Sequence, residues 1–239
     1  MAINVGVIGA GWVATDRHLP ALKKAKNANI VAVFDRNADR AGVAARKYGA
    51  QAFHSNVDEL LSQPIDTVVI CTPPQAHFEL ITKSLEADKH VLVEKPMATS
   101  VPDADAMIAA ADQAGKLLGV AFQERYSDTG QKIRTAIDEG LFGTIVLGEA
   151  RLKWYRSQEY YDVGGWRGTW KMDGGGALAN QTIHNIDLLV WYMGRPVAPE
   201  VAIEQIPFDR RTQPGRTAIA VRFPARLELQ RAPERDVGP

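Results

Sequence analysis

VGVIGAGWVA, at residues 5–14, closes a continuous apolar run that begins at Ile3 and opens a segment with helical periodicity. An apolar run that ends in glycine predicts a parallel strand buried on both faces. The turn that follows fits the pattern G-x-G-x-x-G/A. Gly9 permits a tight turn, Gly11 lets the backbone approach a pyrophosphate, and Ala14 keeps the helix close to the sheet, while the helix N-terminus offers N–H groups to an anion. The residues expected to contact a dinucleotide here are Gly9, Gly11, Trp12, Val13 and Ala14.

Asp35 strengthens the dinucleotide interpretation. It follows a second apolar run, Ile30 to Phe34, and lies 24 residues after Gly11. A carboxylate at this place can accept hydrogen bonds from the adenosine ribose hydroxyls and would repel a 2′-phosphate, which favours NAD over NADP. Arg36 could stack on adenine or pair with a phosphate, so NADP stays possible.

Strands alternate with helices through residues 1–126, which predicts βαβ units and a parallel sheet in a nucleotide-binding domain. Gly49 is expected to end the second helix. The expected strands are 3–9, 30–34, 66–71, 90–93 and 117–122, and the expected helices are 13–26, 37–48, 78–87 and 103–114.

The pattern changes at about Ser127, and residues 127–239 are expected to form an α+β domain. Helices are expected at 131–139 and 177–193, and strands at 144–155, around Ile203, Ile206 and Phe208, and at 217–223. Residues 224–239 contain six charges and three prolines without sustained alternation, so they do not continue a strand.

Composition excludes several classes of protein. Among 239 residues, 28 basic side chains balance 28 acidic ones, which argues against a nucleic-acid binder or a polybasic membrane-surface protein. The single cysteine, Cys71, excludes an internal disulfide and suits a reducing cytosol. Residues 1–15 resemble neither a signal peptide nor a membrane span, so a cytoplasmic protein is expected. Four of the histidines (His18, His54, His77 and His90) show no metal-ligand spacing, and no metal is expected.

Further motifs resemble one family. They are Glu94-Lys95-Pro96, the run DGGGAL at 173–178 with His184 and Asp187 behind it, and Cys71-Thr72-Pro73-Pro74 with His77. Together with GAGWVA they resemble the Gfo/Idh/MocA family of NAD(P)-dependent oxidoreductases over residues 1–223. The resemblance implies an α/β Rossmann domain with a doubly wound parallel sheet, followed by an α+β domain with an open, mostly antiparallel sheet. It also implies NAD(P) as cofactor, sugar or polyol substrates, and homo-oligomers for full-length members.

The same resemblance implies roles for individual residues. Lys95 matches the catalytic lysine, and Glu94 and Pro96 hold its strand-end turn. Glu94 and Lys95 are also expected to contact the cofactor. His184 matches a histidine that acts as acid/base or positions the reacting hydroxyl. The loop near the nicotinamide is matched by Thr72, Pro73 and His77, and residues facing the substrate are matched by Gln123 and Arg125.

Asn180 departs from the family pattern, which often has an aspartate there. An amide cannot take a proton, so acid–base work would fall on His184 or Lys95, and Asn180, one helical turn before His184, could hold a substrate hydroxyl. Asparagine at this position indicates either a family member that acts on another substrate or one that has lost its activity. The loop containing Trp166 and Arg167 could bind a sugar through aromatic and charged groups, although packing explains aromatic residues in this region equally well.

The leading functional hypothesis is hydride transfer between NAD(P) and a secondary hydroxyl of a sugar, polyol or sugar derivative. Two alternatives stay open, NAD-dependent glycoside cleavage and an NAD-binding chain without turnover. Because family members are longer, the sequence also suggests a member truncated in its second domain, with an incomplete sheet and doubtful assembly into oligomers.

Overall fold

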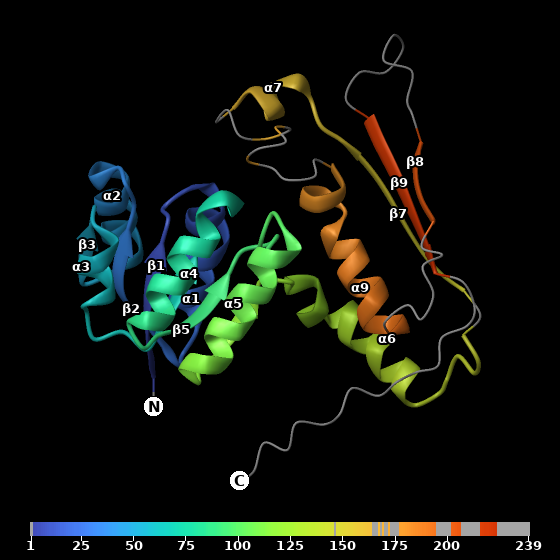
Figure 1. Ribbon diagram of the computed structural model, residues 1–239, viewed down its shortest axis with the longest axis horizontal. Helices are drawn as coiled ribbons and strands as arrows, with labels where there is room; N and C mark the ends of the chain where they lie inside the picture. The colour runs from blue at the N-terminus through green and yellow to red at the C-terminus, as the bar shows by residue number, and fades with distance from the viewer. Residues whose placement is uncertain are drawn as a thin grey trace. The chain divides into compact units, whose positions relative to one another are not determined.

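A computed structural model describes residues 2–145, 147–163, 167, 169, 172, 177–194, 202–206 and 216–223 (Figure 1). The chain divides into two compact units. Unit 1 is formed mainly by residues 2–121, and unit 2 begins at Phe122.

In the described part of unit 1, six parallel strands form one sheet in the order β3-β2-β1-β4-β5-β6. This order runs outward in both directions from β1, which confirms the predicted doubly wound sheet. The strands are β1 Ile3–Ile8, β2 Ala28–Phe34, β3 Ala52–His54, β4 Thr67–Ile70, β5 His90–Val93 and β6 Leu118–Val120.

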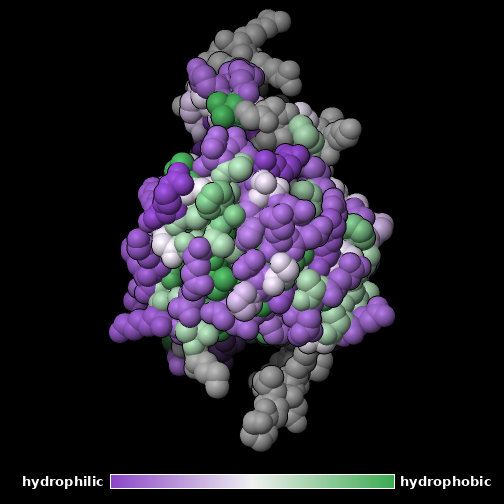
Figure 2. Space-filling model, turned by 90° about the vertical axis from the view of Figure 1, so that its left-hand side faces the viewer, coloured by the Kyte–Doolittle hydropathy of each residue, from purple (hydrophilic) through white to green (hydrophobic). Residues whose placement is uncertain are grey.

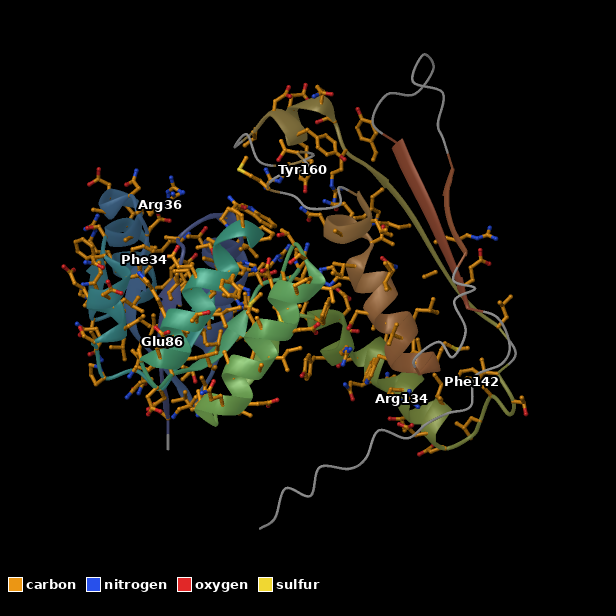
Figure 3. All side chains as sticks on the ribbon, in the orientation of Figure 1. Phe34, Arg36, Glu86, Arg134, Phe142 and Tyr160 are labelled. Carbon is orange, nitrogen blue, oxygen red and sulfur yellow. The ribbon has the colours of Figure 1, made fainter. Side chains whose placement is uncertain are left out.

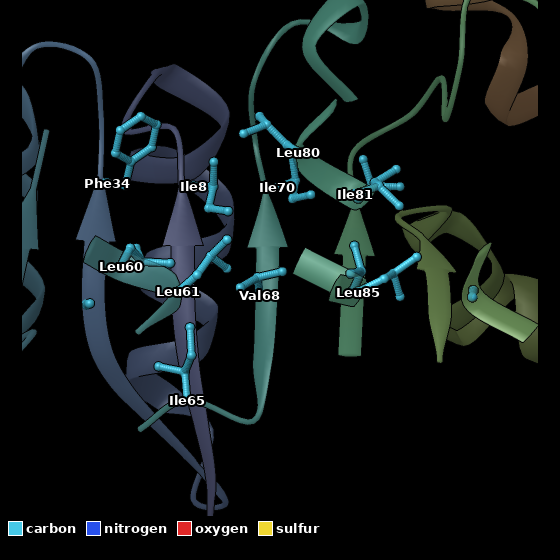
Figure 4. Packing of buried hydrophobic residues seen from close by; sticks show 14 of the residues in the cluster. Ile8, Phe34, Leu60, Leu61, Ile65, Val68, Ile70, Leu80, Ile81 and Leu85 are labelled. Carbon is cyan, nitrogen blue, oxygen red and sulfur yellow. The ribbon is translucent and has the colours of Figure 1, made fainter. Parts of the chain in front are cut away.

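Helices cover both faces of this sheet, because the central strands are apolar on both sides. On one face, Ile8, Val68 and Ile70 pack with Leu60 and Ile81 (Figure 4). On the other face, buried side chains that include Val7, Val33 and Leu19 form a second cluster. The helical segments of unit 1 are the π-helical η1 Ala14–His18, α1 Leu19–Lys24, α2 Ala38–Tyr48, α3 Val57–Leu61, the 3-10 turn η2 Pro74–Ala76, α4 His77–Glu86 and α5 Val101–Ala114.

Three elements of unit 1 were not expected from the sequence, namely β3, α3 and the 3-10 turn η2. Each is at most five residues long, so none gives a readable periodicity, and β3 extends the sheet only at its edge. The helix expected at 13–26 also differs, because its first part is the π-helical segment η1 and its last regular residue is Lys24. The predicted stop at Gly49 is confirmed, since this glycine has the left-handed φ of 80°.

In the described residues of unit 2, three antiparallel strands form a sheet in the order β7-β9-β8. Leu189 and Met193 of its long helix pack with Ala150 and Ile145. This agrees with the expected open antiparallel sheet. The described elements are η3 Gln123–Tyr126, α6 Asp128–Asp138, β7 Gly148–Tyr155, α7 Gln158–Asp162, η4 Ala177–Gln181, α9 Ile183–Met193, β8 Ala202–Ile206 and β9 Arg216–Phe223.

The expected continuous helix over 177–193 is wrong in detail. Residues Ala177–Gln181 are π-helical, Thr182 forms a turn, and the α-helix begins at Ile183. A π-helical turn holds more residues than an α-helical one, so the simple one-turn spacing between Asn180 and His184 is lost. Helix α7 was also not expected. Phe208 and residues 224–239 lie outside the described residues.

Among the helices that the structure describes, none combines the length and apolar character needed to cross a bilayer. Figure 2 shows the side of the molecule that carries α2 and α3, where polar side chains dominate and apolar ones form small groups. Small apolar groups of this kind are ordinary on a globular protein.

Candidate active site

Three predicted cofactor segments follow neighbouring strands of the unit 1 sheet. The amide of Cys71 donates to the carbonyl of Ile8 at 2.7 Å, and that of Glu94 donates to Ile70 at 2.9 Å. The ladder from β1 through β4 to β5 therefore continues to the ends of the strands. Because parallel strands share one carboxyl edge, the glycine turn, Thr72 and Lys95 all follow the same edge, which is where doubly wound sheets bind ligands.

The glycine turn leaves room for a ligand. Gly9 has φ of 95°, and a Cβ there would lie 3.1 Å from the carbonyl carbon of Cys71, so this position requires glycine. A Cβ at Gly11, by contrast, would have no heavy atom within 4 Å. Ala14 is fully buried beneath the turn, Val13 is half-buried and Trp12 is exposed. The open space at Gly11 fits the close approach of a pyrophosphate.

Asp35 connects the second strand to the glycine turn. Its Oδ2 accepts the N–H of Ala10 at 2.9 Å, and its Oδ1 accepts the N–H of Asn37 at 2.9 Å. Each carboxylate oxygen has two acceptor sites, so capacity for ribose hydroxyls remains. Arg36 is exposed after β2 (Figure 3), and Arg40 Nη1 lies 3.8 Å from Asp35 Oδ2. These positions fit an adenosine ribose.

Glu94 is anchored by a residue to which sequence reasoning gave no functional role. His18 Nε2 lies 2.7 Å from Glu94 Oε1, and Glu94 Oε2 accepts the backbone N–H of Lys95 at 3.1 Å. Burial alone would raise the pKa of Glu94, but the hydrogen bond and charge of His18 and the charge of Lys95 lower it below its usual value. His18 thus ties η1, which follows the glycine turn, to the turn of the predicted catalytic lysine. No local motif signals this contact, because its partners lie 76 residues apart.

His77 is fully buried and links two loops of this edge. Its Nε2 lies 2.9 Å from the carbonyl of Thr72, and its Nδ1 lies 3.0 Å from that of Pro96. Burial lowers the pKa of His77, while the carbonyl contacts and the charge of Glu94 oppose that shift. The ring therefore holds the loop that contains Thr72 and Pro73 against the segment behind Lys95. Thr72 Oγ1 is buried without a hydrogen-bond partner among the described residues, which leaves a polar group at the cofactor edge.

In unit 2, His184 lies in the first turn of α9. The ring of Phe122 stands edge-on to its imidazole, with ring centroids 6.0 Å apart. One turn further along α9, Asp187 accepts two hydrogen bonds from Arg125, from Nε at 2.8 Å and from Nη2 at 2.5 Å. Arg125 also lies against the rings of Phe122 and Trp191, at 5.9 and 5.7 Å.

Arg125, which was expected to face the substrate, binds Asp187 through its Nε and Nη2. That hydrogen bond and the charge of Asp187 raise the pKa of Arg125. The pair fastens η3 to the helix that carries His184. Asp187 belongs to the same sequence motif as His184, but the motif indicates no role for it, since its partner lies 62 residues away.

The remaining predicted substrate residues are distributed as follows. Asn180 is buried in η4, and Gln123 is exposed in η3. The guanidinium of Arg167 lies 4.6 Å from the centre of the Tyr160 ring, and its Nη1 donates to the carbonyl of Val163. Trp166 lies outside the described residues. Within the described chain, no three His, Cys, Asp or Glu side chains are grouped so that they could ligate a metal ion.

Comparisons with known proteins agree with this arrangement. Residues 3–122 match the family model of the oxidoreductase family with an NAD-binding Rossmann fold, and residues 131–225 match the Gfo/Idh/MocA C-terminal domain. The chain is 32% identical to D-glucoside 3-dehydrogenase of Escherichia coli, over 83% of this chain and 56% of that protein. It is 31% identical to inositol 2-dehydrogenase 3 of Saccharopolyspora erythraea, over 89% of this chain and 59% of that protein.

Among solved structures, the WlbA dehydrogenase of Chromobacterium violaceum, in complex with NADH and UDP-GlcNAcA, has a TM-score of 0.73 and 37% identity. That match covers 85% of this chain and 57% of the other. The chain spans between 56% and 61% of the length of four curated relatives that it matches. Both the family models and the parallel sheet with its glycine turn lead to one conclusion. The chain belongs to the Gfo/Idh/MocA oxidoreductase family, and residues 3–122 are its NAD-binding Rossmann fold.

Proposed function

We propose that the protein is an NAD(H)-dependent oxidoreductase that acts on a secondary hydroxyl, or the corresponding ketone, of a sugar, a polyol or a sugar derivative. The observation that carries this proposal is the position of Lys95. Lys95 follows β5, and β5 lies beside β4, which in turn lies beside β1, the strand that leads into the glycine turn. Its neighbour Glu94 contacts His18 of η1, the segment that follows the glycine turn. The names of the relatives, a glucoside dehydrogenase, an inositol dehydrogenase and a protein bound to a nucleotide sugar, support the substrate class.

The cofactor would be held by the glycine turn and by residues of the same sheet edge. Gly11 offers the close approach, Asp35 accepts ribose hydroxyls and disfavours a 2′-phosphate, and Thr72 offers a hydroxyl. NAD is therefore the proposed cofactor in preference to NADP. When bound, NAD supplies the hydride acceptor, and the protein supplies orientation and proton handling.

Lys95 and His184 are the groups proposed to handle the hydroxyl proton. A histidine exchanges protons near neutral pH, and a lysine ammonium stabilises a developing alkoxide. Glu94 holds the backbone of Lys95 through its Oε2, so the lysine starts from a fixed turn. Asn180, an amide, can orient a hydroxyl but cannot accept its proton. The single buried cysteine, Cys71, suits a reducing compartment, and we propose the cytoplasm as the site of action.

The test is a turnover assay with NAD⁺ and with NADH against a panel of polyols, aldoses, glycosides and nucleotide sugars or their ketones. Lys95→Ala should lower turnover by about 100-fold or more, the scale of a lost acid–base or electrostatic group. Lys89→Ala is the matched control, because Lys89 precedes the same strand, β5, at the opposite edge of the sheet. It should leave turnover unchanged.

Absence of turnover across the panel, with NADH still bound, would instead support an NAD-binding chain without activity. Release of a free sugar without net change in NADH would support glycoside cleavage. Equal effects of Lys95→Ala and Lys89→Ala on turnover would show that Lys95 takes no part in the reaction.

A further inference from the structure

Arg156 follows β7, and the contacts that fix it among the described residues are all with neutral groups. Its guanidinium carbon lies 4.9 Å from the centre of the Trp154 ring and 5.1 Å from that of Tyr160. Its Nη1 donates to the carbonyl of Tyr155, and its Nη2 donates to Gln181 Oε1, both at 3.1 Å. The side chain is thus held in one orientation before any ligand arrives.

Among the described residues, Arg156 differs from three other arginines of unit 2 in the partners of its positive charge. Arg125, Arg134 and Arg151 each form an ion pair with a carboxylate. Within the described part of the chain, no carboxylate lies within ion-pair distance of Arg156, and its Nε is buried without an acceptor. On nearby α7, Asp162 accepts a hydrogen bond from Gln158, and Glu159 accepts one from Ser157.

A second guanidinium lies on the same aromatic ring. Arg167 is 4.6 Å from the centre of the Tyr160 ring, whose hydroxyl accepts a hydrogen bond from Gln181 Nε2 at 2.8 Å. Figure 3 shows Tyr160 on α7 among neighbouring side chains. The two guanidiniums lie against the same ring, and the Gln181 amide connects that ring to Arg156.

We propose that Arg156, with Arg167, Tyr160 and Gln181, forms a subsite for an anionic group of the substrate, a carboxylate or a phosphate attached to a sugar. Guanidinium groups bind both anions through charge-assisted hydrogen bonds. Gln181 precedes His184 by three residues, so the subsite adjoins in sequence the group proposed to handle the hydroxyl proton. The inference rests on the proposed function and narrows its substrate class to sugar acids and sugar phosphates.

The experiment measures binding without turnover, by titration calorimetry of the whole chain with D-glucuronate, D-glucose 6-phosphate and neutral D-glucose. At least one of the anionic sugars should bind about tenfold more tightly than glucose, the effect of one charge-assisted hydrogen bond. Tight binding of glucuronate alone would identify a carboxylate as the ligand group, and tight binding of the phosphate alone would identify a phosphate.

Arg156→Gln should reduce that preference to about twofold or less. Arg151→Gln, on the same strand, is the matched control and should keep it, because Arg151 pairs with Glu149. Arg156→Lys retains the charge but not the planar guanidinium, and should keep part of the preference, so the subsite can be tested even if the glutamine variant does not fold.

Equal binding of all three sugars by the wild-type chain would overturn the subsite, as would an unchanged preference in the Arg156 variants. Turnover of neutral sugars, together with equal binding of charged and neutral sugars, would uphold the proposed function and reject the subsite. Preferential binding of the anionic sugars without turnover of any sugar would uphold the subsite and reject the proposed function.

Discussion

Glu94 in unit 1 and Asp187 in unit 2 each hold a basic partner beside a residue proposed for catalysis, but the two pairs differ in kind. His18 contacts Glu94 through one nitrogen, with both side chains largely buried. Arg125 contacts Asp187 through two parallel hydrogen bonds, with the aspartate buried and the arginine 37% exposed. A guanidinium can bind a carboxylate through two parallel hydrogen bonds, whereas one imidazole nitrogen offers a single contact. The turn of Lys95 is therefore held by one contact from His18, and α9 by a two-contact pair with Arg125.

The largest effect on stability is expected from breaking the pair in unit 2. Asp187→Asn leaves Arg125 without its charged partner, and should lower the free energy of unfolding by about 2 kcal/mol, less than for a fully buried pair because Arg125 is partly exposed. Urea unfolding followed by tryptophan fluorescence measures this, since Trp191 lies beside Arg125. Asp138→Asn is the control, because Asp138 pairs with Arg134 on the surface of α6 and should cost no more than about 0.5 kcal/mol. Equal losses in the two variants would contradict a special role for Asp187.

His77 should make unit 1 less stable in weak acid. Its pKa is lowered in the folded chain, so between 6.5 and that lower value the unfolded chain binds more protons, and stability falls as the pH falls through this range. One proton gives a slope of at most about 1.4 kcal/mol per pH unit. Unfolding of the wild type and of His77→Asn, measured from pH 8 to pH 5, should differ in slope by up to this amount. Parallel curves would show that the folded chain does not lower the pKa of His77.

Glu94 should act in a more acidic range. Its folded pKa is lowered from 4.5, so its contribution to stability is present above that value and is lost as the pH falls toward the folded pKa. Glu94→Gln removes the titration and should flatten the acid limb of the stability curve below pH 4.5, by less than about 1.4 kcal/mol per pH unit. Unfolding midpoints between pH 5 and pH 3 measure this. An acid limb as steep in the variant as in the wild type would contradict the contribution of the His18 contact.

The smallest effect is expected at Glu149, which pairs with Arg151 on β7. The arginine is more than half exposed, so Glu149→Gln should change the free energy of unfolding by less than about 0.5 kcal/mol. Thermal unfolding of this variant gives the reference value for Asp187→Asn and Glu94→Gln. A loss of stability comparable to that of Asp187→Asn would mean that burial does not determine how much an ion pair contributes to the free energy of unfolding.

Much of unit 1 could be predicted because its central strands are buried on both faces and read as continuous apolar runs. The glycine turn and Asp35 were found for the same reason, since a strand fixes the residues that follow it. Short elements such as β3 and α3 carry too few residues for a readable period. The contacts of His18 with Glu94 and of Arg125 with Asp187 join residues more than 60 positions apart, and no local pattern encodes them. The roles of Lys95, His184 and Asn180 stay proposals built on position and on the family.

Equilibrium binding of NADH to Gly11→Val and Lys95→Ala tests most directly the claim that the glycine turn holds the cofactor while Lys95 serves the reaction. A Cβ at Gly11 meets no heavy atom within 4 Å, so the valine variant should fold with an unchanged thermal midpoint. Its NADH affinity should nevertheless fall about 100-fold or more, because the side chain fills the space for the pyrophosphate. Lys95→Ala should bind NADH nearly as tightly as the wild type. NADH affinity unchanged in Gly11→Val, or lost equally in both variants, would contradict the account.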